Sequence, residues 1–446
     1  MKKISIEKIA GCAVLLSICV FISACGEGNT GYELNDPTSE SGTSPVVILP
    51  DEGKKEPETT PAPAQKPARD LPMPEAVNAF NWDFFDMQDT GSDLFFSPFS
   101  IESALVMALS GAKDGTFDEL AAVLNIGDTE AFMDSYLQLA KGYESDSAKL
   151  TVANSLWIDK SFEKEYGIDP SFVSKLEEKM DAEVISEDFR NHPDKAASDI
   201  TKWVKKNTDN LIPDYQSASD NSTVLDIINA IYFFGEWKDK FDAADTFEMD
   251  FRTKNGARTV KMMNMHDGRF RYLKEKGFKG LELPYGNGEA VMDIILSEDD
   301  EDLSAPDAFK KLSSSDREDF LDNLSGAGET KINALRLPKF TMDLTCEGLK
   351  ETLQKMGAVS AFDAGKADFS GITKDLYISD IAHRAKIEVD EEGSRAAAVT
   401  EVTMAVTGAL VDDGEWIEFV CDRPFVFVIR DSSTGTILFT GVVNTP

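Results

Sequence analysis

The side chains that most often perform catalytic chemistry are scarce in this sequence. Only three histidines occur, His192, His266 and His383, and none lies in a His-Glu-x-x-His metal motif. The chain has no Gly-x-Ser-x-Gly segment of the kind that carries a nucleophilic serine, and no Cys-x-x-Cys pair. We therefore do not expect an enzyme, and we expect no metal site and no cofactor.

Two acidic segments resemble functional motifs but lack other residues that those functions require. Asp89-Thr90-Gly91-Ser92 is similar to an aspartic-protease loop, but that chemistry needs a second such loop, and none occurs. The apolar strand that should precede the loop is also missing, because Asp86 and Gln88 stand there. The run Glu298-Asp299-Asp300-Glu301-Asp302 lacks the alternation and the glycine of a calcium loop. We expect it to form a solvated surface turn.

The most informative segment lies near the C-terminus, between residues 394 and 407. Read as a strand, its alternate side chains form two rows. One row contains only small or apolar side chains and Thr400, namely Ser394, Ala396, Ala398, Thr400, Val402, Met404 and Val406. The other row is Arg395, Ala397, Val399, Glu401, Thr403, Ala405 and Thr407, and it contains both charges. The segment could therefore enter a sheet with its first row buried.

A helix is the alternative for this segment, because its alanine-rich part has high helix propensity. Periodicity favours the strand without excluding the helix. Gly393 gives the backbone a pivot just before the segment. Gly408 and then Asp412-Asp413-Gly414-Glu415 follow it, which is typical of an exposed loop.

The sequence predicts both helices and strands among the elements that would position this segment. Apolar spacing predicts a helix over 100–126 with Ser100 as its N-cap, and a second over 349–356 that ends at Gly357. Short apolar runs over 291–296 and 425–429 indicate buried strands. Because helices gather in the first half and strands in the second, the pattern predicts an α+β fold.

The N-terminus has the features of a targeting segment. Lysines precede an apolar run from Ile9 to Ile22, which is too short to span a membrane, so residues 1–24 indicate a signal peptide. The run ends Ile22-Ser23-Ala24-Cys25, which resembles the bacterial lipobox, so we expect Cys25 to receive a lipid and anchor the protein. The alternative is an ordinary signal peptide cut after Ala24.

Residues 25–74 are dense in Pro, Thr, Ser, Glu and Asp and predict a disordered linker. Residues 75–446 contain no second linker and no internal repeat, so they predict one folded domain. Three of the five cysteines lie in the first 25 residues. We therefore expect Cys346 and Cys421 to be unpaired core thiols.

The composition also limits the partners. The chain has 446 residues and a net charge of −35, so its surface repels phosphate backbones and we expect no nucleic-acid binding. The same charge opposes an electrostatic hold on anionic lipid, which leaves the lipid anchor as the contact with a membrane.

At this point a family resemblance is evident in the residues. Glu391-Glu392-Gly393-Ser394-Arg395-Ala396-Ala397-Ala398-Val399-Thr400 resembles the hinge of inhibitory serpins, Glu-Glu-Gly-Thr-Glu-Ala-Ala-Ala-Ala-Thr, with departures at Ser394, Arg395 and Val399. Further serpin-like segments follow the family's order and spacing over about 370 residues. They are Phe96-Ser97-Pro98-Phe99-Ser100-Ile101, Asn154-Ser155-Leu156-Trp157, Asn229 through Trp237, Leu337-Pro338-Lys339-Phe340, Ala367-Asp368-Phe369-Ser370-Gly371, Arg423-Pro424-Phe425 and Phe439-Thr440-Gly441.

The resemblance implies a serpin fold and a suicide-substrate mechanism. Helices of the N-terminal half would pack on a large central mixed sheet, with smaller sheets and an exposed reactive-centre loop. A serine protease would cleave this loop, which would then insert as a central strand and trap the protease as a covalent acyl-enzyme. The insertion would release on the order of 10 kcal/mol from burial and backbone hydrogen bonds.

Particular residues receive roles from the resemblance. Ser97, Ser100, Asn229 and His383 correspond to the serpin shutter, the polar contacts between the strands that must part. Trp237 corresponds to the breach, where insertion begins. Counting Glu391 as the first residue, the reactive bond follows the seventeenth, Thr407, and precedes Gly408, with Met404, Ala405 and Val406 as alternates.

The residues around this bond favour some proteases over others. No Lys or Arg occurs between Arg395 and Arg423, so a trypsin-type pocket has no cation to bind. Small uncharged residues fit elastase-like or subtilisin-like proteases. The alternative function is a non-inhibitory serpin-fold binding module at the cell surface, although such members often carry bulky or charged residues on the inserting row.

The remaining expectations concern cofactors, assembly and location. The family's heparin-binding helix would lie near 128–143, where Lys141 is the one cation, so we do not expect activation by heparin. We expect a monomer, held at the extracellular face of a bacterial membrane as a lipoprotein or else secreted.

Overall fold

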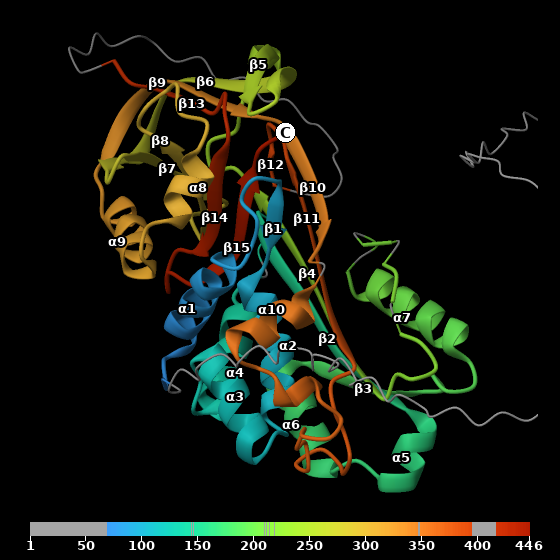
Figure 1. The fold of residues 1–446 in the computed structure, drawn as a ribbon. Coiled ribbons are helices and arrows are strands. Elements are labelled where there is room, and N and C mark those ends of the chain that lie inside the picture. Colours follow the sequence, from blue (N-terminus) through green and yellow to red (C-terminus); the bar gives the residue numbers. More distant parts are fainter. Residues whose placement is uncertain are drawn as a thin grey trace, which may run out of the picture. The chain divides into compact units, whose positions relative to one another are not determined.

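The computed structural model describes residues 69–446, apart from 144, 146, 209, 211, 214, 218, 347 and 395–415 (Figure 1). The helices are α1 Met73–Phe85, α2 Pro98–Leu109, α3 Asp114–Leu124, α4 Thr129–Lys141, α5 Lys160–Tyr166, α6 Pro170–Met180, α7 Pro193–Asn207, α8 Ala305–Lys310, α9 Ser314–Ser325 and α10 Leu349–Met356. Short 3₁₀ turns lie at Ala243–Asp245 and Ser360–Phe362.

The strands concentrate in the second half of the chain, as expected for the α+β class, which the structure confirms. They are β1 Leu94–Phe96, β2 Ala148–Asp159, β3 Ala182–Glu187, β4 Leu225–Glu236, β5 Phe247–Thr253, β6 Gly256–Glu275, β7 Phe278–Tyr285, β8 Ala290–Ser297, β9 Glu329–Pro338, β10 Phe340–Thr345, β11 Asp380–Val389, β12 Gly393–Ser394, β13 Glu418–Val420, β14 Phe425–Asp431 and β15 Ile437–Val443.

Several predicted elements agree with the structure. The predicted helix over 349–356 is α10, and it ends at Gly357. The predicted strands 291–296 and 425–429 lie inside β8 and β14, whose residues are buried throughout. The first helix, α1, begins at Met73, within the last residues of the segment expected to be a linker.

The predicted single helix over 100–126 is wrong, because the structure divides it into α2 and α3. The backbone of residues 111–113 bonds to a distant segment: Gly371 N–H donates to Gly111 O at 3.0 Å, and Lys113 N–H donates to Asp368 O at 2.9 Å. These bonds replace the continuation of the helix. A Cβ on Gly111 would lie 2.2 Å from Ile372 Cγ1, so this close crossing requires glycine.

The N-cap of α2 also differs from the prediction. Ser97, and not Ser100, occupies the cap, and its hydroxyl accepts the Ser100 N–H at 3.1 Å. Pro98 stands at the first helical position, where its fixed φ suits the start of a helix. This correction leaves the Ser100 side chain on the first turn, free to face the neighbouring sheet.

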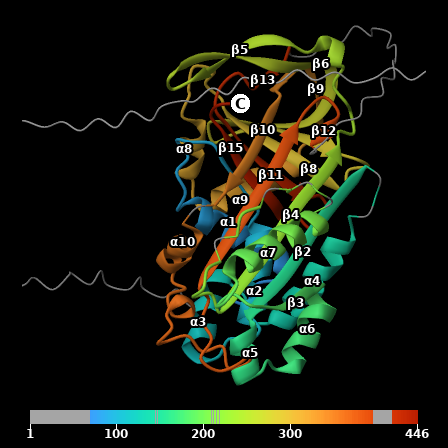
Figure 2. The same ribbon diagram turned by 90° about the vertical axis from the view of Figure 1, so that its right-hand side faces the viewer.

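Two sheets organise the body. A nine-stranded sheet has the order β1-β15-β14-β8-β7-β6-β9-β13, with β5 paired to β6. A six-stranded mixed sheet has the order β10-β11-β12-β4-β2-β3, in which β11 also pairs directly with β4 (Figure 2). Asn229 of β4 and His383 of β11, two of the predicted shutter residues, therefore lie on neighbouring strands of this sheet.

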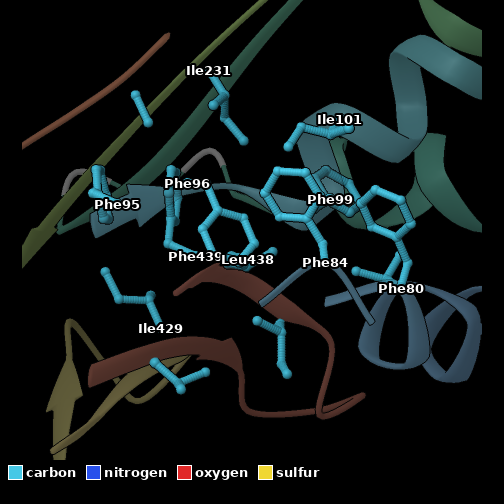
Figure 3. Packing of buried hydrophobic residues seen from close by; sticks show 14 of the residues in the cluster. Phe80, Phe84, Phe95, Phe96, Phe99, Ile101, Ile231, Ile429, Leu438 and Phe439 are labelled. Atoms are coloured by element: carbon cyan, nitrogen blue, oxygen red, sulfur yellow. The ribbon is translucent and has the colours of Figure 1, made fainter. Parts of the chain in front are cut away.

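The core lies where helix α2 and the two sheets meet. Phe80 and Phe84 of α1 lie near Phe99 of α2, while Phe95, Phe96 and Phe439 come from strands of the nine-stranded sheet (Figure 3). The rings of Phe95 and Phe439 stack with centroids 5.3 Å apart. Helix α2 contacts both β15 of the nine-stranded sheet and β4 of the six-stranded sheet.

The outer face of the same sheet is covered by α7 (Figure 2). Trp203 of α7 meets Trp157 of β2 edge to face, with ring centroids 6.3 Å apart, above Ile228 and Ala230 of β4. In the described part of the chain, no helix is both long and apolar enough to span a membrane.

Candidate functional site

A two-residue strand, β12, separates the ends of two longer strands. Strands β4 and β11 are parallel neighbours over Asp226–Ile231 and Asp380–Ala385. Further along, Gly393 and Ser394 lie between them, with Ser394 opposite Val389 of β11 and Gly235 of β4. The predicted hinge thus begins as a strand, antiparallel to both of its neighbours, and the sheet is already open at this end.

The two residues of β12 fit this position closely. The Ser394 side chain is fully buried, and its hydroxyl lies 2.6 Å from the hydroxyl of Tyr285. A Cβ on Gly393 would lie 2.0 Å from Gly235 O, and Gly393 has a φ of +155°. Glycine is therefore required at 393, and a small side chain at 394.

The turn that precedes β12 is anchored by Trp237. Its indole N–H donates to Asp390 O at 2.9 Å, and its backbone N–H donates to Glu392 O at 2.8 Å. The Trp237 ring also stacks on Tyr285, with centroids 4.4 Å apart. The structure therefore brings the predicted breach residue into direct contact with the hinge.

Two lysines hold the acidic side chains of this turn. Lys339 Nζ donates to Glu391, which also accepts the Thr246 hydroxyl at 2.8 Å. Lys240 Nζ lies 2.9 Å from a carboxylate oxygen of Glu392. Burial of Glu391 favours its neutral form, but the hydrogen bonds from Lys339 and Thr246 outweigh it and hold the pKa below its ordinary value.

The four predicted shutter residues meet beneath the place where β4 and β11 are paired. His383 and Asn229 are register partners on β11 and β4. Ser97 N–H donates to His383 Nε2 at 3.0 Å, and Ser100 Oγ lies 3.3 Å from His383 Nδ1. The Ser100 hydroxyl in turn donates to Asn229 Oδ1. All four side chains are buried.

Burial determines the charge of the histidine. It lowers the pKa of His383 to about 3, so the ring is neutral at physiological pH. Since Nε2 accepts the Ser97 N–H, the proton of the neutral ring must lie on Nδ1, which faces Ser100. Protonation would therefore remove the acceptor that ties the start of α2 to β11.

The sequence prediction missed part of this network. Asn229 Nδ2 also donates to Asn154 Oδ1 at 2.6 Å and to Ser103 Oγ at 3.0 Å. Asn154 in turn donates to the Tyr136 hydroxyl at 2.8 Å. The polar contacts thus extend across β2, β4, β11, α2 and α4. The serpin-like segment Asn154-Ser155-Leu156-Trp157 was an available signal for Asn154.

Sequence reasoning also missed the partners of the hinge. Tyr285, Lys339 and Lys240 come from segments far from the hinge in the chain. Lys339 lies in the serpin-like segment Leu337-Pro338-Lys339-Phe340, but that pattern does not indicate a contact with the hinge. Their contact with residues 390–394 depends on how the two sheets meet.

Several predicted site residues lie outside the described part of the chain. They are Arg395, Ala396, Ala397, Ala398, Val399 and Thr400 of the hinge, the reactive-bond residues Thr407 and Gly408 with the alternates Met404, Ala405 and Val406, and the lipid-attachment residue Cys25.

The structure also describes the two acidic segments and the two cysteines that the sequence analysis discussed. Asp89 to Ser92 form a turn after α1, and the acidic run 298–302 forms a turn after β8 in which Asp300 lies 2.6 Å from Lys279 Nζ. Cys346 and Cys421 are free thiols, and burial raises the pKa of Cys346 to about 12.

Comparisons with known proteins agree with this geometry. A family model described as "Serpin (serine protease inhibitor)" matches residues 75–446. An uncharacterised serpin-like protein of Thermococcus kodakarensis is 32% identical over 441 residues, covering 96% of this chain and 97% of that protein. Leukocyte elastase inhibitor A of Mus musculus is 34% identical over 366 residues, covering 79% of this chain and 93% of that protein.

A solved structure is similar as well. The native state of the thermophilic serpin tengpin superposes with a TM-score of 0.73 at 29% identity, covering 83% of this chain and 93% of that one.

Proposed function

Because the chain belongs to the serpin family, whose members are generally protease inhibitors and not enzymes, we propose that it inhibits serine proteases irreversibly. The protease cleaves the segment after β12, near Thr407-Gly408, and the cleaved segment inserts between β4 and β11. The observation that supports this most strongly is the register in which β12 already enters the six-stranded sheet.

Continuing that register aligns small and apolar side chains with buried neighbours. Ser394 lies opposite Gly235 and Val389. Four residues further on, Ala398 would lie between Ile231 and Ala385, which are both 0% exposed. The whole row that begins with Ser394 would follow it to the inner face, because alternate residues of a strand share a face.

The same register brings one polar residue to the shutter. Six residues beyond Ser394, Thr400 would lie between Asn229 and His383. Its hydroxyl can both donate and accept, so it can bond to these groups when β4 and β11 part. Thr400, a polar residue of the inward row, would thus meet polar groups on both neighbouring strands.

Insertion requires two movements in the described body. The backbone pairing of Asp226–Ile231 with Asp380–Ala385 has to open. On the outer face, α7 packs over Ile228 and Ala230 and has to shift or yield. The relative rates of this rearrangement and of acyl-enzyme hydrolysis determine whether the protease is trapped or released. A change of about 1.4 kcal/mol in the insertion barrier changes the ratio of trapped to released protease tenfold.

The target is proposed to be an elastase-like or subtilisin-like protease. The residues from Met404 to Gly408 are small or medium and uncharged, which suits shallow apolar pockets. Asp412, Asp413 and Glu415 follow the bond and would favour a protease with a basic surface.

A panel of proteases tests this function. The full chain is incubated with elastase, subtilisin, chymotrypsin and trypsin, and the products are separated on a denaturing gel. We expect a boiling-resistant complex with elastase or subtilisin, and a released peptide that begins near Gly408. Cleavage by every protease without any complex would support the non-inhibitory alternative, and faster trapping of trypsin than of elastase would contradict the proposed target class.

We also propose that Cys25 is lipidated and tethers the inhibitor to the outer face of a bacterial membrane. The lipobox-like Ile22-Ser23-Ala24-Cys25 supports this, as does the linker composition that follows it. Mass spectrometry of the mature N-terminal peptide would detect diacylglycerol on Cys25, whereas an unmodified Cys25 would contradict the proposal.

A further inference from the structure

Trp416 is the most exposed large apolar side chain of the described residues. Its exposed fraction is 71%, against 50% for Met87, 42% for Tyr166 and 41% for Phe247. Exposing an indole to water has a free-energy cost that burial in an interface recovers, and tryptophan is enriched among the residues that dominate protein interfaces.

The backbone beside this tryptophan is fixed. Ile417 N–H donates to Asn333 Oδ1 at 2.9 Å, and Asn333 N–H donates to Ile417 O at 2.8 Å. Directly afterwards, β13 pairs with β9, with Glu418 opposite Ala334. The indole N–H donates to Glu418 Oε1 at 3.1 Å, so the polar edge of the ring has a partner and its apolar face remains exposed.

Trp416 is also close to the proposed reactive bond along the chain. It is the ninth residue after Thr407, so at roughly 3.4 Å per residue it lies at most about 30 Å from that bond. A specific protein interface engages roughly 20 to 30 residues on each side. A protease that holds the bond in its active site would therefore have Trp416 within reach.

We propose that Trp416 is a docking contact for the target protease, outside the residues that enter its active-site cleft. This inference rests on the inhibitory function proposed above. The exposed ring, held in place by Ile417 and Glu418, would pack against an apolar patch beside the protease active site and would speed capture. It takes no part in strand insertion, because it lies beyond the bond that is cut.

The test compares Trp416→Ala with Trp416→Phe and with Tyr166→Ala as a matched control. Tyr166 is an exposed aromatic residue at the end of α5, far from β13 in the described body (Figure 1). Two quantities are measured: the Kd for elastase whose catalytic serine is replaced by alanine, and the second-order rate of complex formation with active elastase.

We expect Trp416→Ala to raise the Kd and lower the trapping rate about tenfold or more, with the stoichiometry of inhibition unchanged. Trp416→Phe should recover most of the loss, and Tyr166→Ala should match the wild type. An unchanged Kd and rate in Trp416→Ala would overturn this contact while leaving inhibition intact. If the wild type traps neither elastase nor any other protease, the inhibitory function itself fails, and this contact with it.

Discussion

At the scale of single residues, buried polar groups connect α2 to β11 of the six-stranded sheet, and under the proposed function they would influence how readily this sheet opens. His383 accepts the Ser97 N–H and lies next to Ser100, and it is neutral because burial lowers its pKa. Its bonds connect α2 to β11, a strand that the proposed insertion would move. The protonation of a single ring can therefore change the stability of the native state.

We predict that acid weakens the native state through His383. The folded pKa of about 3 lies below the usual value of 6.5, so the unfolded state binds the proton more readily between these values. The stabilising contribution is complete above pH 6.5 and is lost as the pH falls towards 3. To isolate it, the first unfolding midpoint is measured for the wild type and for His383→Gln at pH 7.5, 5.5 and 4.5. The advantage of the wild type should shrink as the pH falls, and a constant advantage would contradict the assignment.

Glu102 of α2 presents the opposite case. It is 0% exposed, and neither carboxylate oxygen has a hydrogen-bond partner among the described residues. Burial raises the pKa of Glu102 well above its ordinary value, so the folded state favours the protonated form. This group destabilises the fold increasingly as the pH rises above about 4.5, where the unfolded chain releases the proton.

We predict that Glu102→Leu raises the first unfolding midpoint. The change removes an unpaired buried carboxyl group, which should stabilise the native state by roughly 2 kcal/mol or more at pH 7.5. The gain should be smaller at pH 4.5, because there the unfolded chain also keeps the proton. A loss of stability would show that Glu102 has a favourable role, and a gain that does not depend on pH would contradict its raised pKa.

At the scale of elements, the hinge acts through a turn and a two-residue strand. The turn at 390–392 is bonded to Trp237, and β12 lies between β4 and β11. In the proposed mechanism, β12 would therefore represent the first step of insertion, and the later steps would continue the same ladder.

We predict that Gly393→Ala removes this first step. Its Cβ would lie 2.0 Å from Gly235 O, so β12 could not keep its place. The variant should be cleaved normally by elastase but should form less covalent complex. Ser394→Ala serves as the control, because it keeps the backbone and loses only the bond to Tyr285. Equal complex yields for the two variants would contradict a role for β12 in starting insertion.

The sequence alone predicted much at this scale, for physical reasons. Apolar periodicity located α10, β8 and β14, and the motif resemblance located the four shutter residues that the structure brings together. The sequence did not predict the break between α2 and α3, because this break depends on backbone hydrogen bonds that residues 111–113 form with Asp368 and Gly371. The contact of Tyr285 with Ser394 also could not be predicted from the sequence, because it depends on how the two sheets meet.

At the scale of the whole molecule, the native state should be kinetically trapped. Under the proposed function, the row that begins with Ser394 would favour a buried position, yet in the described structure β4 and β11 are paired over six residue pairs where it would lie. Cleavage near Thr407 would release the strand and allow the sheet to fill.

We predict that a single cut makes the protein much more resistant to heat. Filling the sheet would gain on the order of 10 kcal/mol, which for a domain of this size corresponds to a rise of roughly 10 °C or more in the unfolding midpoint. Intact and loop-cleaved protein are compared by circular dichroism at the same pH. Identical midpoints would contradict a trapped native state.

The central claim, that the cleaved segment inserts with the Ser394 row facing inward, is tested most directly by the complex yield of two matched variants. Ala398→Glu would place a carboxylate between Ile231 and Ala385, where an unpaired charge costs several kcal/mol. Ala397→Glu adds the same group one residue earlier, on the outer face opposite Lys386 by the same register. With elastase, we predict that Ala397→Glu traps the protease like the wild type, whereas Ala398→Glu is cleaved with little or no complex. An equal yield of covalent complex from the two variants would contradict the account.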